Sequence, residues 1–411
     1  MTTEPTTEIC RISQARLTNV LDFGSQPLGN GFLSLNEFSS EYFYRMQLGF
    51  SEESMMLQLL KQPDPEQMFH ENYAFFSSTS IAMAKHFQQF AESVMASGFL
   101  HDDPFVVELG CNDGIMLKHF ASRGIRHLGI EPALNVAKVA NENGVRTISE
   151  FFSEEIAERL LDNEGAADVI MAANVMCHIP DFRGVIKGFK TLLKKTGVVI
   201  FEDPYLGDVV SKTSYDQIYD EHVFLFSALS IQYAFGLEGM ELIDVQPQTT
   251  HGGSMRYVLA HRGAHVARPS VSLLIEQEKT QGLDKYETFF MFREAVEQSK
   301  KDLRELLERF KDEGMRVAGY GATSKSTTML NYCGIGPDVV EYISDTTPIK
   351  QGKYSPGMHI PIKPYEFFLN DPPDIAILFA WNHAQEIMAK EKAFISQGGR
   401  FITHVPHVGY L

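Results

Sequence analysis

The stretch that decides the fold is Phe105-Val-Val-Glu-Leu-Gly-Cys-Asn-Asp-Gly114. An apolar, β-branched run leads into an acidic residue and a glycine-rich turn, and the run Ile115 to Phe120 follows as an expected helix. Glycine has no side chain and tolerates unusual φ/ψ angles, so such a turn lets the backbone approach a ligand closely. The N-terminus of the following helix would face the same ligand. The predicted ligand contacts in this turn are Glu108, Gly110, Asn112 and Gly114.

A second acidic strand end strengthens this prediction. The next strand-like run, from His127, ends in Glu131-Pro132, where a carboxylate can accept hydrogen bonds from both hydroxyls of a ribose. The E-x-G-x-x-x-G spacing differs from the G-x-G-x-x-G of dinucleotide enzymes, whose extra glycine admits a pyrophosphate. S-adenosylmethionine (SAM) has a ribose but no phosphate, and it suits this wider turn. Glycines that merely shape a tight turn are the alternative, and the presence of Glu131 argues against it.

Residues 81–247 show a regular alternation of strand-like and helical segments. The strand-like runs are 105–110, 127–132, 167–174 and 197–204. Such alternation predicts a parallel sheet with helices on both faces. Ligands lie at the carboxyl ends of such strands, so Asn174 and His178, which follow the third run, are candidate cofactor contacts. An ordinary helix-start role for His178 is equally compatible with the sequence.

The segments on either side of this domain have different patterns. Residues 1–80 are interrupted by glycine and proline, which predicts a small, irregular N-terminal domain. Residues 248–411 begin with a helical connector at 269–313, whose apolar positions include Leu303, Leu306, Leu307 and Phe310. A second strand–helix series follows at 316–326, 339–345, 374–381 and 400–406. The predicted fold is therefore α/β, with two Rossmann-like domains behind a small N-terminal one.

A compact run of polar residues follows the strand-like segment 197–204. It reads Tyr215-Asp-Gln-Ile-Tyr219-Asp-Glu221-His222. At the carboxyl edge of a sheet, these side chains can supply a base, a group that tunes it and a proton donor. His222 suits the base because the pKa of histidine lies near neutrality. A solvated acidic loop is the alternative on composition alone, and the position after the strand favours the catalytic interpretation.

Composition excludes several classes of function. The 411-residue chain has a net charge of -17, which would repel a nucleic-acid backbone. The start of the chain lacks the basic and apolar regions of a signal peptide, and no run of about 18 apolar residues predicts a membrane span. Four scattered cysteines fit a reducing compartment. We therefore expect a cytoplasmic protein without nucleic-acid or membrane partners.

Over nearly its whole length the sequence resembles the SAM-dependent sugar 3-C-methyltransferases of deoxysugar biosynthesis. The matching stretches are Tyr73–Ser80, Glu108–Gly114, Tyr219–His222, Thr250–Ser254 and Gly319–Ser326. The resemblance implies methyl transfer to C3 of a 4-keto-6-deoxy sugar carried by a nucleoside diphosphate. It makes His222 the base and places Tyr219, Glu221 and Tyr73 in the active site. Glu221 is expected to orient or tune His222.

The expected chemistry follows from the substrate. A proton on C3 is acidic because it lies next to the C4 carbonyl, and its removal gives an enolate that hydrogen-bond donors stabilise. The resulting carbanion attacks the methyl group of SAM in line. Two alternatives stay open: a SAM enzyme that methylates oxygen or nitrogen of another small molecule, and a non-catalytic binding protein. The retained Tyr219, Glu221 and His222 speak against the second.

The C-terminal segment Gly319-Tyr-Gly-Ala-Thr-Ser-Lys-Ser326 follows a strand-like run and opens an expected helix. Glycines, hydroxyls and a lysine at a helix N-terminus can bind a diphosphate. Fold-shaping turns are the alternative for each segment taken alone. The carrier nucleotide and the oligomeric state stay open, although three tethered domains could enclose the site without a second subunit. The predicted substrate contacts are His251, Ser324, Lys325, Asn382 and His383.

The resemblance fails at the N-terminus. Family members usually carry a zinc site made of two C-x-x-C pairs, but this chain has Cys10-Arg-Ile-Ser13 and Ser51-Glu-Glu-Ser54. Serine is a poor zinc ligand compared with a thiolate. We therefore predict that this protein binds no metal and that apolar contacts hold its first domain. The residues expected to make them are Phe23, Leu28, Phe32, Leu33, Tyr44 and Leu48.

Overall fold

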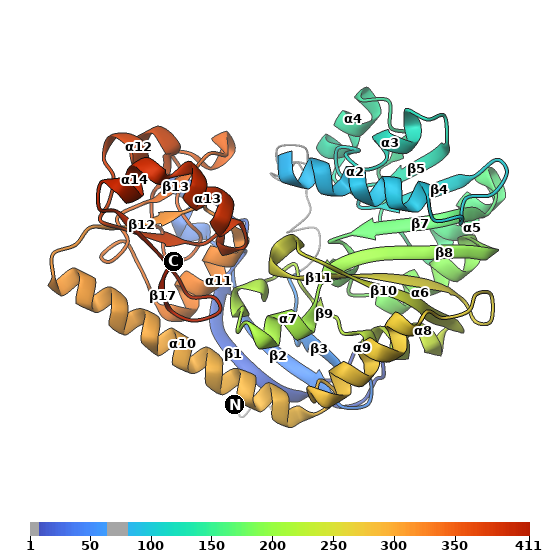
Figure 1. The fold of residues 1–411 in the computed structure, drawn as a ribbon, viewed down its shortest axis with the longest axis horizontal. Helices are drawn as coiled ribbons and strands as arrows, with labels where there is room; N and C mark the ends of the chain where they lie inside the picture. The colour runs from blue at the N-terminus through green and yellow to red at the C-terminus, as the bar shows by residue number, and fades with distance from the viewer. Residues whose placement is uncertain (1–7, 64–80) are drawn as a thin grey trace.

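The computed structural model describes residues 8–63 and 81–411, and it places the strand β4 (Phe105–Leu109) between β7 and β5 in a seven-stranded sheet (Figure 1). The order of the sheet is β10-β11-β8-β7-β4-β5-β6. Strands β4 to β8 run parallel to one another, and β11 runs antiparallel to both of its neighbours, β8 and β10. The other strands are β5 (Arg126–Ile130), β6 (Thr147–Ile148), β7 (Ala167–Ala173), β8 (Leu193–Pro204), β10 (Met240–Gln248) and β11 (Ser254–His261).

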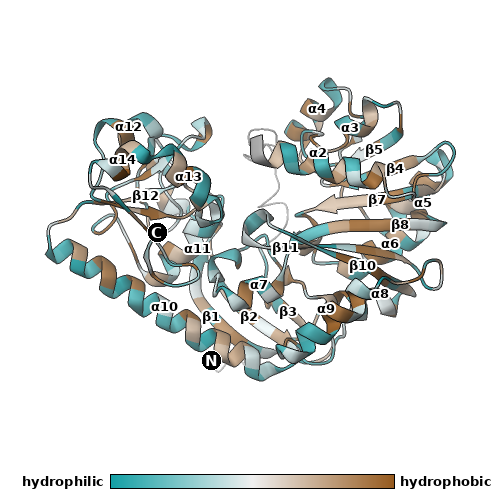
Figure 2. Cartoon of the chain, in the orientation of Figure 1, coloured by the Kyte–Doolittle hydropathy of each residue, from teal (hydrophilic) through white to brown (hydrophobic). Residues whose placement is uncertain are grey.

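Both faces of this sheet are covered. Along β4, Val106 belongs to a core that includes residues of α2, α3 and α4, while Val107 belongs to a core that includes residues of α5, α6 and α8. Figure 2 shows apolar strands between helices of mixed hydropathy. The expected α/β architecture is thus confirmed. The helices are α2 (Ile81–Met95), α3 (Lys118–Ala121), α4 (Leu134–Glu142), α5 (Glu154–Glu164), α6 (Phe182–Leu192), α7 (Leu206–Ser211) and α8 (Ala228–Leu237).

Two details of this domain differ from the expectation. The helix expected over 115–120 is shorter, because residues 115–117 form turns and α3 begins only at Lys118. A series of turns, rather than a long helix, therefore follows β4 at this edge of the sheet. The sheet also continues beyond residue 247, where we had expected the domain to end, because β11 pairs with both β8 and β10.

The C-terminal part begins with two helices, α9 (Pro269–Thr280) and α10 (Tyr286–Asp312), as the charged, helix-period segment predicted. The apolar positions of α10 named above are all buried. A six-stranded sheet of order β14-β13-β12-β15-β16-β17 follows, parallel except for β17. Its elements are β12 (Val317–Tyr320), α11 (Ser324–Cys333), β13 (Ile343–Asp345), β14 (Ile362–Pro364), α12 (Tyr365–Asn370), β15 (Ile375–Leu378), α13 (Ala384–Lys390), α14 (Lys392–Ser396), β16 (Arg400–Thr403) and β17 (Gly409–Tyr410).

The N-terminal segment is more regular than its sequence predicted. It forms an antiparallel sheet of β1 (Thr18–Pro27), β2 (Phe43–Ser51) and β3 (Met56–Leu59), and the fourth strand is β9 (Phe224–Leu225) from the central part of the chain. Gly24 lies inside β1 at a register shift, with φ of 74°. A bulge of this kind interrupts the alternation of side chains, so the glycine suggested a loop where a strand continues.

The expected apolar contacts of this domain are present in part. Phe23, Phe32 and Leu48 are buried, whereas Leu28, Leu33 and Tyr44 are half-buried. Phe50 packs on Phe289 of α10, with ring centroids 4.3 Å apart. The N-terminal sheet is therefore held by the long helix of the connector as well as by its own core.

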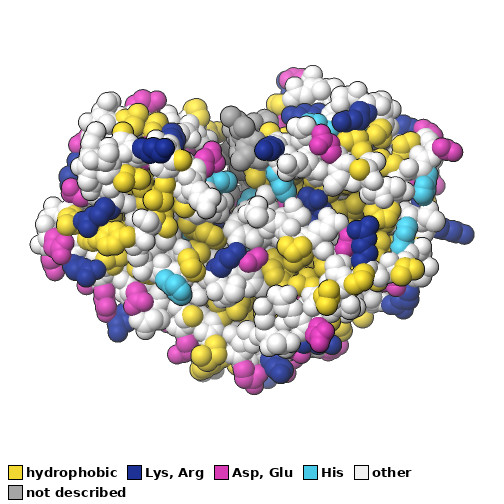
Figure 3. Space-filling view, viewed as in Figure 1, with side chains coloured by type: hydrophobic (Ala, Val, Ile, Leu, Met, Phe, Trp, Pro, Cys, Tyr) yellow, Lys and Arg dark blue, Asp and Glu magenta, His cyan; other side chains and the backbone are white. Residues whose placement is uncertain are grey.

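The surface agrees with the charge analysis. Figure 3 shows lysine, arginine and acidic side chains scattered over the visible face without a continuous basic patch. None of the helices in the described ranges is both long and apolar enough to cross a bilayer.

Glu278 on α9 joins the connector to the central domain. Its buried carboxylate accepts hydrogen bonds from the amides of Ala228 (2.8 Å) and Leu229 (2.9 Å), at the start of α8, and from the Tyr205 hydroxyl (3.0 Å). Burial raises the pKa of this carboxyl. The first turn of α8 therefore depends on an acceptor from another helix.

We predict that Glu278→Ala lowers the urea midpoint of unfolding, because it leaves two buried amides without an acceptor at about 1–3 kcal/mol each. Glu278→Gln keeps one acceptor oxygen and should lose less. Glu276→Ala, an exposed position on the same helix, is the control. Equal midpoints for Glu278→Ala and this control would contradict the role of the carboxylate.

Candidate functional site

The turn after β4 has the backbone that the sequence predicted. Gly110 and Gly114 have φ of 59° and 81°, and Asn112 between them has φ of 50°. A Cβ added to Gly110 would lie 2.3 Å from Cγ2 of Val175, and one added to Gly114 would lie 2.8 Å from Cγ2 of Val145. Both positions therefore require glycine for space as well as for φ.

Two buried carboxyl groups line this turn. Glu131 accepts hydrogen bonds from the amides of Asn112 (3.0 Å) and Ala133 (2.9 Å), and burial raises its pKa. Burial and the neighbouring Glu131 raise the pKa of Glu108 well above its ordinary value. Within the described residues, Oε2 of Glu108 is buried without a hydrogen-bond partner. Pro132 is tied to this edge by its carbonyl, which accepts a bond from the Ser149 hydroxyl (3.2 Å).

This arrangement fits SAM. A carboxylate has about four acceptor positions, so Glu131 retains capacity for ribose hydroxyls after binding two amides. Glu108 offers a buried acceptor to a cationic group such as the ammonium of the methionyl part. A cationic ligand would also relieve the repulsion between the two carboxyls.

The end of β7 leads from this turn toward the second half of the site. Asn174 is half-buried with φ of 57°, and its amide donates to the carbonyl of Glu202 (2.7 Å). Four residues later, His178 ends the short helix η3 (Met176–His178). Its ring stacks on that of His222, with centroids 5.2 Å apart. Burial lowers the pKa of His178 to about 4. One expected cofactor residue, His178, thus lies directly against the expected base.

His222 is buried and held in one tautomer. Its Nδ1 lies 2.7 Å from the backbone carbonyl of Gln217. A carbonyl only accepts hydrogen bonds, so Nδ1 carries the proton and Nε2 carries the lone pair. Burial, followed by the proximity of His178, lowers the pKa of His222 well below 6.5. The ring is therefore a neutral imidazole with a basic Nε2, which is the state that a general base requires.

Glu221 does not orient His222, contrary to our expectation. Its carboxyl accepts a hydrogen bond from the Asn30 amide (2.8 Å), and the neighbouring Asp220 accepts one from the amide of Gly29 (2.9 Å). Burial raises the pKa of Glu221 to about 8 and that of Asp220 to about 6. The backbone carbonyl of Gln217 takes over the orienting role. The acidic pair instead ties the N-terminal domain to the catalytic segment.

Tyr219 is the second member of the motif that meets His222. The two rings lie 4.0 Å apart between centroids, at an interplanar angle of 36°. The Tyr219 side chain is half-buried. Tyr73, the other expected active-site tyrosine, lies outside the described residues.

The ligand atoms of Cys177, His178 and His222 all lie within 4.8 Å of one another, which raises the question of a metal. Burial and then Asp203 raise the pKa of the Cys177 thiol well above its ordinary value, while burial lowers the pKa of both imidazoles. The three groups are thus neutral, and the proton on Nδ1 of His222 leaves Nε2 as the ligand atom that this residue offers.

The expected phosphate cradle faces this region from the C-terminal domain. Nζ of Lys325 lies 3.4 Å from the carbonyl of His251, 3.5 Å from Oδ1 of Asn382 and 5.1 Å from the centre of the Trp381 ring. Burial lowers the pKa of Lys325 to about 8. Lys325 therefore contacts residues of two other segments, η5 (Thr250–Gly252) and the short helix η7 (Trp381–His383).

The remaining predicted substrate residues lie around Lys325. Ser324 opens α11, and its Cβ is 3.2 Å from the position of a Cβ on Gly29. Burial, followed by the charge of Lys325, lowers the pKa of His251 to about 3, and His383 also has a lowered pKa from burial and a smaller contribution of Lys325. Gly252 packs directly under Trp381, where an added Cβ would lie 2.1 Å from the ring. The Thr250–Ser254 segment thus touches the C-terminal domain.

Asp216 is a residue that the sequence analysis did not single out. It is fully buried, and its Oδ2 accepts a hydrogen bond from Nε1 of Trp381 (2.7 Å) and lies 3.5 Å from Nε2 of His404. His404, Lys325 and Trp381 hold its pKa low against the effect of burial. Asp216 therefore supplies a negative charge that interacts with Lys325 and raises its pKa against the effect of burial. The sequence did offer a sign of this role, because Asp216 lies inside the polar run that begins at Tyr215.

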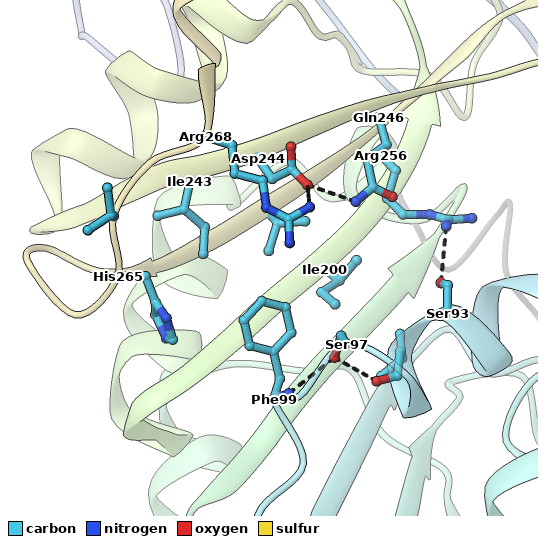
Figure 4. Close-up of a pocket in the computed structure, with 13 residues that line it drawn as sticks. Ser93, Ser97, Phe99, Ile200, Ile243, Asp244, Gln246, Arg256, His265 and Arg268 are labelled. Atoms are coloured by element: carbon cyan, nitrogen blue, oxygen red, sulfur yellow. Dashed lines mark hydrogen bonds and ion pairs between the residues drawn. The ribbon is translucent and has the colours of Figure 1, made fainter. Parts of the chain in front are cut away.

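Glu202, at the end of β8, anchors the loop η5. Its carboxylate accepts hydrogen bonds from Thr250 (2.8 Å), His86 (2.7 Å) and Arg256 (2.9 and 3.2 Å). Arg256 also lines a cavity of about 310 Å³ beside α2, shown in Figure 4. The other arginine there, Arg268, is paired with Asp244 (2.9 Å). None of the predicted site residues lines this cavity, so we do not assign it to the substrate.

The fold is that of a Rossmann-like SAM methyltransferase, and comparisons with known proteins specify the family further. A family model described as "C-methyltransferase C-terminal domain" matches residues 249–406, one described as "Methyltransferase domain" matches 55–245, and one described as "Putative zinc binding domain" matches 10–69. The C-methyltransferase NovU of Streptomyces niveus is 33% identical over 390 residues, which cover 94% of this chain and 93% of the relative. The chain belongs to the C-methyltransferase family and is a SAM-dependent methyltransferase.

More distant similarities cover only part of the chain. A ubiquinone biosynthesis O-methyltransferase of Colwellia psychrerythraea is 34% identical over 103 residues, which are 24% of this chain and 41% of that protein. The structure of the magnesium protoporphyrin IX methyltransferase of Synechocystis PCC 6803 with bound SAM has a TM-score of 0.34 at 13% identity, covering 48% of this chain and 88% of that one.

We predict that Glu131→Ala raises the Kd for SAM by about 10- to 100-fold, because a hydrogen bond to a charged group contributes about 1.5–3 kcal/mol and each 1.4 kcal/mol is about tenfold. Isothermal titration calorimetry measures this directly. Glu142→Ala, at an exposed position of α4, is the matched control. An unchanged Kd for Glu131→Ala would remove Glu131 from the cofactor site.

Proposed function

We propose that this enzyme transfers a methyl group from SAM to C3 of a 4-keto-6-deoxy sugar linked to a nucleoside diphosphate. The observation that carries the proposal is the buried, neutral His222, whose Nε2 carries a lone pair beside His178 of the cofactor domain. Carbon methylation needs a base that removes a proton from carbon, and the hydrogen bond from Nδ1 to the Gln217 carbonyl leaves the lone pair of Nε2 to do so.

The first step is removal of the C3 proton by Nε2 of His222. The bonding pair moves toward the C4 carbonyl and gives an enolate, whose oxygen needs a hydrogen-bond donor. We assign this donor to the hydroxyl of Tyr219, because its ring packs on His222. When bound, SAM would supply an electrophilic methyl group: the enolate pair would form the C3–methyl bond as the methyl–sulfur bond breaks, the C4 carbonyl would re-form, and S-adenosylhomocysteine would leave. The protein's main contribution is to hold C3 and the methyl carbon in line.

Lys325 supports the choice of a nucleotide-linked substrate. It is a half-buried cation at the edge of the C-terminal domain, with Ser324 beside it at the start of α11. Such a group is costly to keep charged away from water, and a diphosphate would compensate for the cost. His251, Asn382 and His383 surround it and would line the same subsite.

Residues of all three domains meet at the site, so we propose that a single chain is the catalytic unit. Asn30 comes from the N-terminal domain, His222 from the central part and Lys325 from the C-terminal domain. The net charge of -17 supports a small anionic substrate held at a local cation rather than a nucleic acid.

The product identifies the acceptor atom. We expect that the protein, incubated with SAM and thymidine- or guanosine-linked 4-keto-6-deoxy sugars, adds one methyl group that NMR locates on C3. Methylation of oxygen, or no product from any 4-keto sugar despite SAM binding, would overturn the sugar assignment and leave the methyltransferase itself intact.

His222→Ala should retain the SAM affinity of the wild type and lose about 10²- to 10⁴-fold in kcat, the usual cost of removing a general base. Single-turnover kinetics at saturating SAM measure this. His127→Ala, on strand β5 and outside the predicted site, is the control for loss of a histidine. If His222→Ala instead binds SAM poorly and turns over normally at saturation, His222 is a cofactor ligand and not the base.

The pKa of Lys325 predicts an alkaline limit. Because its pKa is lowered to about 8, the free enzyme loses this charge as the pH rises through 8, and kcat/KM for the sugar nucleotide should fall there. Lys325→Arg stays charged and should abolish the fall, although its absolute activity will be lower. Lys195→Arg, an exposed position, should retain the wild-type profile. An unchanged alkaline limb in Lys325→Arg would show that another group causes it.

A further inference from the structure

The N-terminal domain brings together two pairs of residues that lie far apart in the sequence. Cys10 and Ser13 lie on the turn before β1, and Ser51 and Ser54 lie at the β2–β3 hairpin. Sγ of Cys10 is 3.2 Å from Oγ of Ser54, and Oγ of Ser13 is 3.2 Å from Oγ of Ser51. The two halves of the pattern therefore face each other in pairs. Cys10, Ser51 and Ser54 are wholly buried, and Ser13 is half-buried.

Backbone amides of the first turn lie close to the Cys10 sulfur. The amides of Ile12 (3.4 Å) and Ser13 (3.5 Å) point at Sγ, and the amide of Ser54 donates to Oγ of Ser51 (3.3 Å). Burial alone would raise the pKa of the Cys10 thiol, but the hydrogen bonds from Ser13 and Ser54 outweigh it and leave the pKa below its ordinary value.

These residues do not fit the zinc ion that the match to a zinc binding domain over 10–69 implies. Structural zinc needs four deprotonated or neutral nitrogen and sulfur ligands, and three of the four groups here are hydroxyls. A Zn–S bond of about 2.3 Å places the ligands of a tetrahedral site about 3.8 Å apart. The two pairs observed here, Sγ of Cys10 with Oγ of Ser54 and Oγ of Ser13 with Oγ of Ser51, are each 3.2 Å apart, and the members of each pair hydrogen-bond to each other directly.

The hairpin that carries Ser51 and Ser54 also reaches the catalytic segment. Its second strand, β3, pairs with β9, with Leu57 opposite Leu225 and Gln58 opposite Phe224. The amide of Leu59 also donates to the carbonyl of Val223 (2.8 Å), the residue directly after His222. On its outer side, Glu53 accepts a hydrogen bond from Tyr233 of α8 (2.8 Å). The hairpin thus fixes the chain on the C-terminal side of the base.

We propose that the thiol–hydroxyl cluster of Cys10, Ser13, Ser51 and Ser54 stabilises the N-terminal sheet in place of a metal ion and so holds the strand that follows His222. The domain folds without metal, and its scaffold retains the geometry of a metal site. Restoring the thiols should therefore restore zinc binding. This inference concerns the stability of the N-terminal domain and does not depend on the identity of the sugar substrate.

The test compares the zinc content of the wild type with that of the variant Ser13→Cys/Ser51→Cys/Ser54→Cys by plasma mass spectrometry after incubation with Zn²⁺ and removal of the excess. We expect no stoichiometric zinc in the wild type and one ion per chain in the variant, with a Tm that falls when EDTA is added. A matched control places the three cysteines at exposed positions of the same domain, Ser25, Ser39 and Ser40, and should bind no stoichiometric zinc.

A second measurement concerns the cluster itself. Ser54→Ala removes the hydroxyl that faces Cys10 and should lower the Tm by about 1–2 °C, the shift expected for about one lost hydrogen bond in a chain of 411 residues. It should also reduce kcat more than the affinity for SAM, because β3 holds the segment after His222 and does not touch the cofactor turn. Stoichiometric zinc in the wild type, or a triple-cysteine variant that folds but binds no zinc, would overturn the proposal.

Discussion

The hydrogen bond from Nδ1 of His222 to the carbonyl of Gln217, 2.7 Å long, is the interaction on which the proposed chemistry depends. It fixes the proton on one ring nitrogen and leaves the other as the acceptor. Burial then keeps the ring neutral, since it lowers the pKa of His222. A side-chain carboxylate in place of the carbonyl would stabilise the protonated ring, raise its pKa and favour a charged imidazole. A backbone acceptor sets the orientation without adding a negative charge.

The rest of the structure holds this short segment from three sides. The SAM domain supplies His178, whose ring stacks on the base. The N-terminal domain supplies Gly29 and Asn30, which bind the carboxyls of the Asp220–Glu221 pair. The C-terminal domain supplies Thr328, whose hydroxyl donates to the carbonyl of Ile218 (2.9 Å). Residues of three domains therefore hold the loop that carries the proposed base.

Much of the fold could be predicted from the sequence, because the sequence patterns that specify it are local. The turn after β4 needs glycine at Gly110 and Gly114 for φ and for space, and the strand runs are apolar because they are buried on both sides. The N-terminal sheet was not recognised, because a bulge at Gly24 breaks the pattern of β1 and its last strand, β9, comes from a distant part of the chain. The site residues could be predicted as types, but their partners could not. Asn30 and Glu221 are 191 residues apart, and nothing local links them.

The central claim is that His222 creates a carbanion at C3 before any methyl group is transferred. It is tested most directly by exchange of the C3 hydrogen of a nucleotide-linked 4-keto-6-deoxy sugar for deuterium in D₂O, with S-adenosylhomocysteine in place of SAM. The account predicts exchange at C3 with the wild type, observed by NMR, and a loss of about 10²-fold or more in its rate with His222→Ala. Exchange at the same rate in both proteins would contradict the assignment of His222 as the base.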